Sequence, residues 1–185
     1  YFDLVLPKVL PEGVASNIPP YYFYDIQSHV FSDITPKDRI SLSYYSGIDD
    51  IIFDTFGLDG RWGNNTISGH YRRVFSERLV GNFLLANSRF FTEFGLGGDY
   101  GLVSFNEIDD NTISGDFSWF KSSNSTIKFG SQVKWLGFEY TNKFNEDIQF
   151  EIKTDPIEFA NYIKLKYEPN DLMIVEPGLR LNYYN

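Results

Sequence analysis

The sequence lacks cysteine and is poor in histidine, methionine and positive charge. With 0 Cys, it forms no disulfide, has no thiol nucleophile and offers no cysteine ligand to a metal. Its 25 acidic residues outnumber 16 basic ones, giving a net charge of −9. This balance argues against nucleic acid as a partner, because phosphate contacts need clustered Lys and Arg.

Long hydrophobic runs are also missing. The longest uninterrupted apolar runs have about four residues, at Tyr21–Tyr24, Phe83–Ala86 and Leu172–Val175, whereas a membrane-spanning helix needs about 20. The sequence therefore excludes a transmembrane helix.

Motifs of catalysis and nucleotide binding are absent as well. No serine stands in G-x-S-x-G, and no P-loop or G-x-G-x-x-G occurs. The stretch Gly95-Leu96-Gly97-Gly98 has the wrong spacing and is typical of a loop. We therefore expect a protein that is not an enzyme and uses no cofactor.

What the chain has in excess is aromatic residues, 18% of the total, set in alternating runs. Along 112–120, Ile113, Phe117 and Trp119 share one side of an extended chain, and Asp116 lies on the other. A helical spacing would instead mix Lys with Trp on one face. This period of two, with many aromatic and β-branched residues, predicts β-strands.

Short polar turns divide these runs at regular intervals. They are centred near Pro36, Glu77, Asn124 and Pro169, so successive turns lie 41, 47 and 45 residues apart. Longer polar or glycine-rich stretches alternate with them, and we predict these to be loops: Ile48–Gly60, Gly95–Asp110 and Tyr140–Pro156. Short turns at one end and long loops at the other are typical of outer-membrane β-barrels.

We therefore predict an all-β fold, an antiparallel up-and-down meander of long strands that is part of a transmembrane β-barrel. The eight main strands, paired in sequence order with negligible helix, are expected near 21–34, 38–54, 62–75, 79–95, 110–121, 126–141, 157–168 and 172–185. Tyr1–Leu6 and Arg180–Asn185 both resemble strand interiors, so we expect residues 1–185 to be one partial barrel domain of eight to nine strands, without a plug domain.

A soluble β-sandwich shows the same alternation, so the pattern alone does not choose between them. Runs of about 12–16 residues exceed the usual soluble strand and the 9–11 that cross a bilayer. Aromatic residues also gather near the run ends, where membrane interfaces favour Tyr and Trp. These features favour the barrel. The alternative is a soluble all-β carbohydrate-binding domain, a sandwich or jelly roll with Trp62, Trp119 and Trp135 as sugar platforms.

The alternation also predicts which side chains share a face. The expected outer, lipid-facing set is Ile113, Phe117, Trp119, Phe129, Val133, Trp135, Ile163, Leu165 and Leu179. The candidate lumen-lining set is Asp25, His29, His70, Arg72, Asp116, Lys128, Gln132, Lys134, Lys164 and Arg180. Arg73, next to Arg72, would then point outward, which is tolerable only near the membrane edge.

Metal binding is the less favoured reading of two groups of side chains. His29 and His70 lack a second ligand at i, i+2, so we interpret both as hydrogen-bonding groups. Neighbouring carboxylates, which are the ligand type calcium takes, are instead interpreted as solvated loop charges; they are Asp49, Asp50, Asp54, Asp109, Asp110, Glu146 and Asp147. We predict no metal site.

Several stretches resemble strands of TonB-dependent outer-membrane receptors of Gram-negative bacteria. One pair is Pro20–Ile26 followed by Lys37–Gly47, and a second is Trp62–Thr66 followed by Val74–Leu79. The closing Pro177-Gly178-Leu179-Arg180-Leu181-Asn182-Tyr183 is similar to the family's PGLRL-x-Y strand.

The resemblance implies a function and a location. Receptors of this family import large, scarce solutes such as iron chelates, vitamins or glycans across the outer membrane. Their barrel of 22 strands encloses an N-terminal plug, and a TonB box binds the energy-transducing partner. Neither plug nor box is visible here. The implied partners are therefore outer-membrane lipid, a plug and TonB reached through other segments, and a transported solute.

Overall fold

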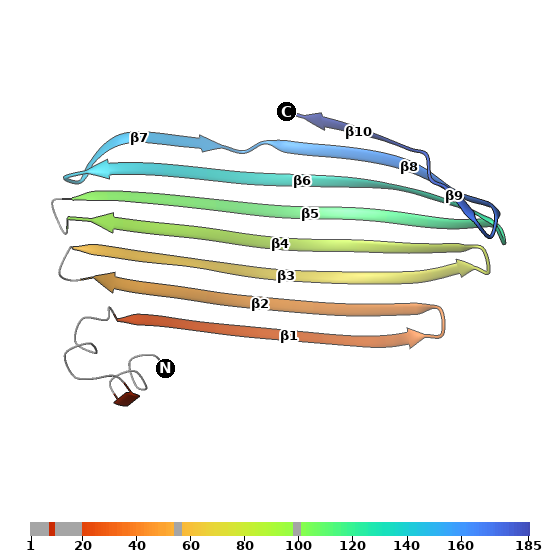
Figure 1. The fold of residues 1–185 in the computed structure, drawn as a ribbon, viewed down its shortest axis with the longest axis horizontal. Coiled ribbons are helices and arrows are strands. Elements are labelled where there is room, and N and C mark those ends of the chain that lie inside the picture. Colours follow the sequence, from red (N-terminus) through yellow and green to blue (C-terminus); the bar gives the residue numbers. More distant parts are fainter. Residues whose placement is uncertain (1–7, 10–19, 54–56, 98–100) are drawn as a thin grey trace.

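The computed structural model describes residues 8–9, 20–53, 57–97 and 101–185. These residues form one ten-stranded antiparallel sheet, with helical structure only at residues 8–9. The strands are β1 (Tyr21–Thr35), β2 (Asp38–Phe53), β3 (Leu58–Ser76), β4 (Leu79–Leu96), β5 (Leu102–Ser122), β6 (Ser125–Phe144), β7 (Asp147–Thr154), β8 (Ile157–Asn170), β9 (Met173–Val175) and β10 (Gly178–Tyr184). Figure 1 shows the strands side by side as one layer. No helix within the described ranges is long and apolar enough to cross a membrane.

The strands pair in the order β1-β2-β3-β4-β5-β6-β8-β10. β7 and β8 pair with successive parts of β6, so together they form one interrupted strand. In the same way β9 and β10 pair with successive parts of β8. The interruptions fall at Pro156 and Pro177, because proline has no N–H to donate to a ladder. Each proline still accepts through its carbonyl, from the N–H of Leu136 (3.0 Å) and of Leu165 (2.9 Å). The predicted meander of eight antiparallel paths in sequence order is confirmed.

The predicted long loops are wrong. β5 begins at Leu102, inside the expected loop 95–110, and β7 occupies 147–154, inside the expected loop 140–156. The connections at this end span only residues 54–57, 97–101 and 145–146. Asn145 and Glu146 have φ of 50° and 68°, which suits a two-residue hairpin turn with two left-handed positions. Charged residues and glycines in these segments indicated loops, but the hydrogen-bonded pairing of the strands continues through most of both segments. The expected strand at Tyr1–Leu6 lies outside the described residues.

The sheet has no covered core. Among the described hydrophobic residues only Ala160 is buried, whereas Leu85, Ile113 and Leu179 are 63%, 48% and 62% exposed. A sandwich or jelly roll would bury one face of this sheet against a second sheet. The soluble sandwich considered from the sequence is therefore contradicted, and each apolar side chain here needs a partner outside this chain segment.

Candidate functional site

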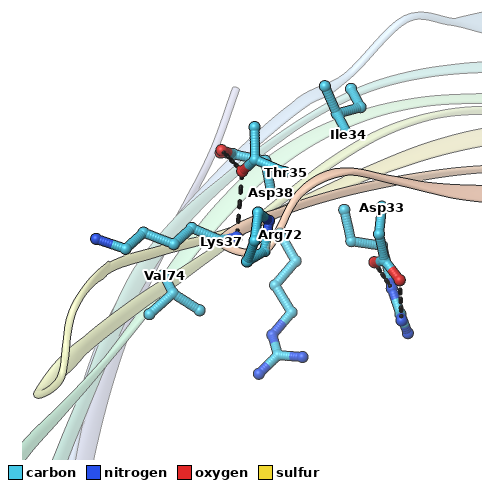
Figure 2. A pocket seen from close by; sticks show the side chains of 9 residues that line it. Asp33, Ile34, Thr35, Lys37, Asp38, Arg72 and Val74 are labelled. Atoms are coloured by element: carbon cyan, nitrogen blue, oxygen red, sulfur yellow. Dashed lines mark hydrogen bonds and ion pairs between the residues drawn. The ribbon is translucent and has the colours of Figure 1, made fainter.

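Cross-strand register assigns each strand residue to one of two faces, since opposed residues share a side and chain neighbours alternate. Asp33 is opposite Arg39, and Arg39 is opposite Arg72. Figure 2 shows Asp33 and Arg72 projecting to the inside of the curve of the strands. We call this side the inner face and the opposite side the outer face.

All nine side chains predicted to face lipid lie on the outer face. Register joins them in rows: Phe117 is opposite Phe129, which is opposite Ile163, which is opposite Leu179. Ile113 is likewise opposite Val133. Trp119 and Trp135 belong to this face, but Trp62 lies on the inner face, so the three tryptophans do not form one sugar platform.

Aromatic rings pack across the outer face over a glycine. The ring of Phe117 lies 5.6 Å from that of Phe83 in a T-shaped pair and 5.3 Å from that of Phe129 in a stacked pair. Gly81 lies on β4 directly opposite Phe117, and a Cβ there would approach the Phe75 ring to 2.8 Å. The missing side chain therefore lets the rings lie against the sheet, which strengthens cross-strand packing.

The apolar band on the outer face, which we call the belt, runs obliquely across the strands. On β2 it extends from Ile40 to Ile48, and on β6 from Ile127 to Trp135. Register places Ile48 level with Glu139, four residues beyond Trp135. Four residues are about 14 Å along a strand, and the four spacings from β2 to β6 are about 19 Å across the strands. The strands are therefore tilted by about 35° from the direction perpendicular to the belt. Transmembrane barrels have strand tilts of about 35–45°.

The belt also has the height of a bilayer's apolar layer. The eight-residue step from Ile127 to Trp135 is about 27 Å along the strand, or about 22 Å along the normal at that tilt. The outward apolar band of such barrels is about 25 Å tall. Tilt and height therefore agree with a wall that crosses an outer membrane.

Beyond the belt, toward residues 54–57, 97–101 and 145–146, the two faces exchange character. The outer face becomes charged: Arg89 pairs with Glu107 at 2.5 Å, and Lys153 pairs with Glu139 at 3.4 Å. The inner face at this level carries exposed apolar side chains among polar ones such as Thr92 and Asn106. The apolar ones, all at least 37% exposed, are Trp62, Phe90, Phe94, Ile108, Phe144 and Phe150. The sequence analysis missed this exchange, although the alternation visibly changes phase near residue 110.

Outside the belt, Asp109 is in an unusual electrostatic environment. Burial raises the pKa of its carboxyl above the ordinary value, and the negative charge of Glu107 raises it further. Arg89 opposes the shift but is itself bonded to Glu107. The ionised form of Asp109 is therefore less stable, relative to the protonated form, in the folded protein than in water.

All ten candidate lumen-lining residues lie on the inner face, as the alternation predicts. Most are held by neighbouring strands: the Tyr45 hydroxyl donates to Asp25 (2.7 Å), and His29 Nδ1 lies 2.8 Å from Ser43 Oγ. Further along the sheet, Lys134 pairs with Asp110 at 3.0 Å. That this face lines a lumen remains a prediction.

Four further members, Lys128, Gln132, Lys164 and Arg180, lie close together across β6, β8 and β10. Arg180 donates to Gln132 at 3.3 Å, and Lys164 pairs with Glu176 at 2.9 Å. Lys128 lies directly opposite Lys164, a like-charge arrangement that costs stability unless anions are near. Sequence reasoning missed Glu176, because it sits in the break before β10 rather than in an alternating run.

One contact on this face reaches across a glycine. The Tyr162 hydroxyl donates to Asp116 Oδ1 at 2.6 Å across Gly130, which register places between them. The sequence analysis missed Tyr162. The contact between Tyr162 and Asp116 depends on how β5, β6 and β8 are aligned, and the alternation within one strand does not reveal that alignment.

Residues near the first hairpin surround a hollow of about 460 Å³, drawn in Figure 2. Asp33 accepts two hydrogen bonds from Arg39, at 2.6 and 2.8 Å. Arg72 projects beside this pair and forms no ion pair with any described residue. The outward Arg73 is 3.4 Å from Asp38 near the same hairpin, at the belt edge.

The side chains considered as metal ligands in the sequence do not come together within the described ranges. His29 is opposite Ser43 on β2, whereas His70 is opposite Ser41, two strands away from β1. Adjacent carboxylates such as Asp109 and Asp110 point to opposite faces, and Asp54 lies outside the described residues. No group of three or more His, Asp or Glu side chains there is arranged to hold a metal ion.

Comparison of structures identifies the fold. The copper transporter OprC matches with a TM-score of 0.70 and 11% identity, over 89% of this chain and 28% of that one. FpvA of P. aeruginosa, solved bound to heterologous pyoverdines, matches with a TM-score of 0.73 and 11% identity, over 91% and 31%. The siderophore receptor PirA from Pseudomonas aeruginosa gives 0.65 and 13%, over 89% and 28%. No protein-family model and no curated protein sequence matches this chain.

This chain spans about a third or less of the length of these solved structures. At such low identities the likeness concerns the fold: the chain has the fold of a segment of an outer-membrane β-barrel wall, as the sequence predicted.

Proposed function

We propose that the chain is part of the barrel of a TonB-dependent outer-membrane receptor that imports a large, scarce solute such as an iron chelate, a vitamin or a glycan. The observation that carries the proposal is the oblique belt with a polar inner face behind it. The belt would contact acyl chains, and the paired ladder satisfies backbone groups that lipid cannot.

The inner face supplies the chemistry expected of a lumen wall. Its charged and hydroxyl side chains, among them Asp25, Arg72, Lys128 and Arg180, would contact a plug and passing solute rather than react with it. The end with the hairpin of Figure 2, where the belt lies close to the turns, would face the periplasm. The opposite end, where the strands continue beyond the belt with a charged outer face, would face outward. TonB would bind through a segment elsewhere in the protein.

A genetic experiment tests the proposal. The gene for the complete protein is deleted, and growth is measured on media with one limiting iron chelate, copper salt, vitamin or glycan at a time. We expect loss of growth on at least one medium, and the same loss when TonB is removed. Growth unchanged on every medium would contradict import, as would a purified protein that stays dispersed without detergent.

A further inference from the structure

A polar pair lies in the middle of the belt on the outer face. Ser131 on β6 is directly opposite Asn161 on β8, and its hydroxyl donates to Asn161 Oδ1 at 2.5 Å. On β6 the belt extends from Ile127 to Trp135, so Ser131 stands four residues from either end. That is about 13 Å along the strand in each direction, which places the pair near the middle of the apolar layer.

Apolar side chains enclose this polar pair. Register puts one row of the belt on its hairpin side and another row on the opposite side. The side chains around the pair are Phe129, Val133, Phe159, Ile163 and Leu181. β6 and β10 pair with β8 on its two sides, so Asn161 belongs to the interior of the wall rather than to an edge of the sheet.

The hydrogen bond within the pair does not satisfy both side chains. The Asn161 amide has two N–H groups in addition to its carbonyl oxygen, and this nitrogen donates to no described residue. Acyl tails accept no hydrogen bond, so at this depth the N–H groups lose the bonds that water would make. A partner that carries an acceptor at the same depth would remove this cost.

A second copy of the same barrel has such an acceptor. Two copies inserted in the same orientation have their Asn161 amides at the same depth, whereas an unrelated partner would need a polar group of its own at that level. An amide both donates and accepts, so two of them pair across a two-fold axis, each N–H donating to the other's carbonyl oxygen. The apolar side chains around them would pack against their counterparts.

We propose that this polar pair is the centre of a contact between two copies of the barrel, with Asn161 of each copy hydrogen-bonded to Asn161 of the other. The two-fold axis is parallel to the membrane normal. Because the wall is curved (Figure 2), the copies meet along only a few strands, and Phe117, two strands away on β5, still faces lipid. The proposal rests on the membrane placement proposed above, but not on the imported solute.

The first test measures association of the complete protein in bilayers. Labelled protein is reconstituted over a range of lipid-to-protein ratios, and single-molecule photobleaching counts the copies in each assembly. We expect the parent to dimerise and Asn161→Leu to associate about tenfold more weakly, since each dimer loses two bonds between copies. Asn161→Gln should keep part of the association.

The matched control for this variant is Asn87→Leu. Asn87 also places an amide on the outer face, but three strands away on β4, where it donates to Asn111 at 2.8 Å. Asn87→Leu should therefore dimerise as the parent does.

Cross-linking gives a second readout that keeps the amide in place. This sequence has no cysteine, so once any native cysteine elsewhere in the protein is replaced by serine, a single introduced Cys reports one position. Iodine, which enters the apolar layer, is used as the oxidant. Ile163→Cys, beside the pair, should join two copies by a disulfide, and Leu42→Cys, in the belt on β2, should not.

Three results would overturn the proposal: a parent that stays monomeric at every lipid ratio, Asn161→Leu dimerising as well as the parent, or cross-linking at position 163 no stronger than at position 42. If Asn161→Leu does not fold, cross-linking decides alone. Flotation of the parent with alkali-washed vesicles is measured in parallel. An inserted monomer refutes the contact only, whereas a protein that does not insert refutes the membrane placement itself.

Discussion

Two halves of the same strands differ in which face is apolar. In the belt half of β5, Ile113 and Phe117 point outward and Asp116 inward; in the other half, Glu107 and Asp109 point outward and Ile108 inward. The backbone and its pairing are the same in both halves. On the placement proposed above, the medium outside the wall differs, with lipid around one half and water around the other. Alternation therefore reports strand geometry, and only its phase reports the environment.

The largest effect should come from placing one charge in each half. Phe117→Arg puts a guanidinium in the belt and should cost about 2–4 kcal/mol of folding free energy in lipid, depending on depth. Phe105→Arg, on the same face of β5 twelve residues away, enters the charged region and should cost far less. Equilibrium unfolding of the complete protein in bilayers measures both. Equal costs at the two positions would remove the distinction between the halves.

A smaller effect should separate the two faces within the belt half. A Cβ at Gly130 would meet Asp116 and come within 2.8 Å of the Gly115 carbonyl oxygen, whereas a Cβ at Gly69 would meet nothing within 4 Å. Gly130→Val should therefore cost about 1–3 kcal/mol through overpacking and loss of the Tyr162 bond. Gly69→Val should be neutral or stabilising, since valine suits an open strand position.

The same unfolding measurement compares these two glycine variants. A destabilised Gly69→Val together with a tolerated Gly130→Val would contradict the cross-strand packing described at these two positions.

The sequence predicted the meander because alternation and turn residues are local properties. It separated the ten polar candidates from the nine apolar ones onto opposite faces of the sheet, since a period of two needs only strand continuity. It failed at β7 and at the start of β5, where charged residues indicated loops. A strand with water on its outer face carries the charges of a loop, so composition alone did not distinguish them there.

Contacts between strands were out of reach of the sequence for a different reason. The bond from Tyr162 to Asp116 across Gly130 depends on the register of three strands, which long-range pairing fixes. The obliqueness of the belt likewise appears only when β2 and β6 are aligned. The row formed by Ile48, Gly63 and Phe91 also needs the register of β2, β3 and β4.

The smallest predicted effect is a pH dependence in the charged half. Because the pKa of Asp109 is raised in the folded protein, the folded state binds that proton more tightly than the unfolded state does. Its ionised form therefore lowers stability as pH rises from about 4 through the raised pKa. Asp109→Asn should raise the thermal unfolding temperature at pH 7 and give no gain near pH 3.

The neighbouring carboxylate provides the control for this prediction. Asp110 points inward and accepts from Lys134 at 3.0 Å and from Thr112 at 2.6 Å. Asp110→Asn should therefore lower the unfolding temperature at pH 7, the opposite sign. Identical responses of the two variants would contradict the assignment of these residues to different faces.

Depth-dependent fluorescence quenching tests the central claim most directly. The native tryptophans, Trp62, Trp119 and Trp135 among them, are first replaced by Phe. A single Trp is then placed at position 117 or at position 105 of the complete protein, which is reconstituted in bilayers with brominated acyl tails, and folding and insertion are checked. Strong quenching at 117 and little at 105 is the predicted result, because the first site lies in the belt and the second above it. Absence of quenching at 117 in an inserted, folded barrel would contradict the assignment of the outer face to lipid.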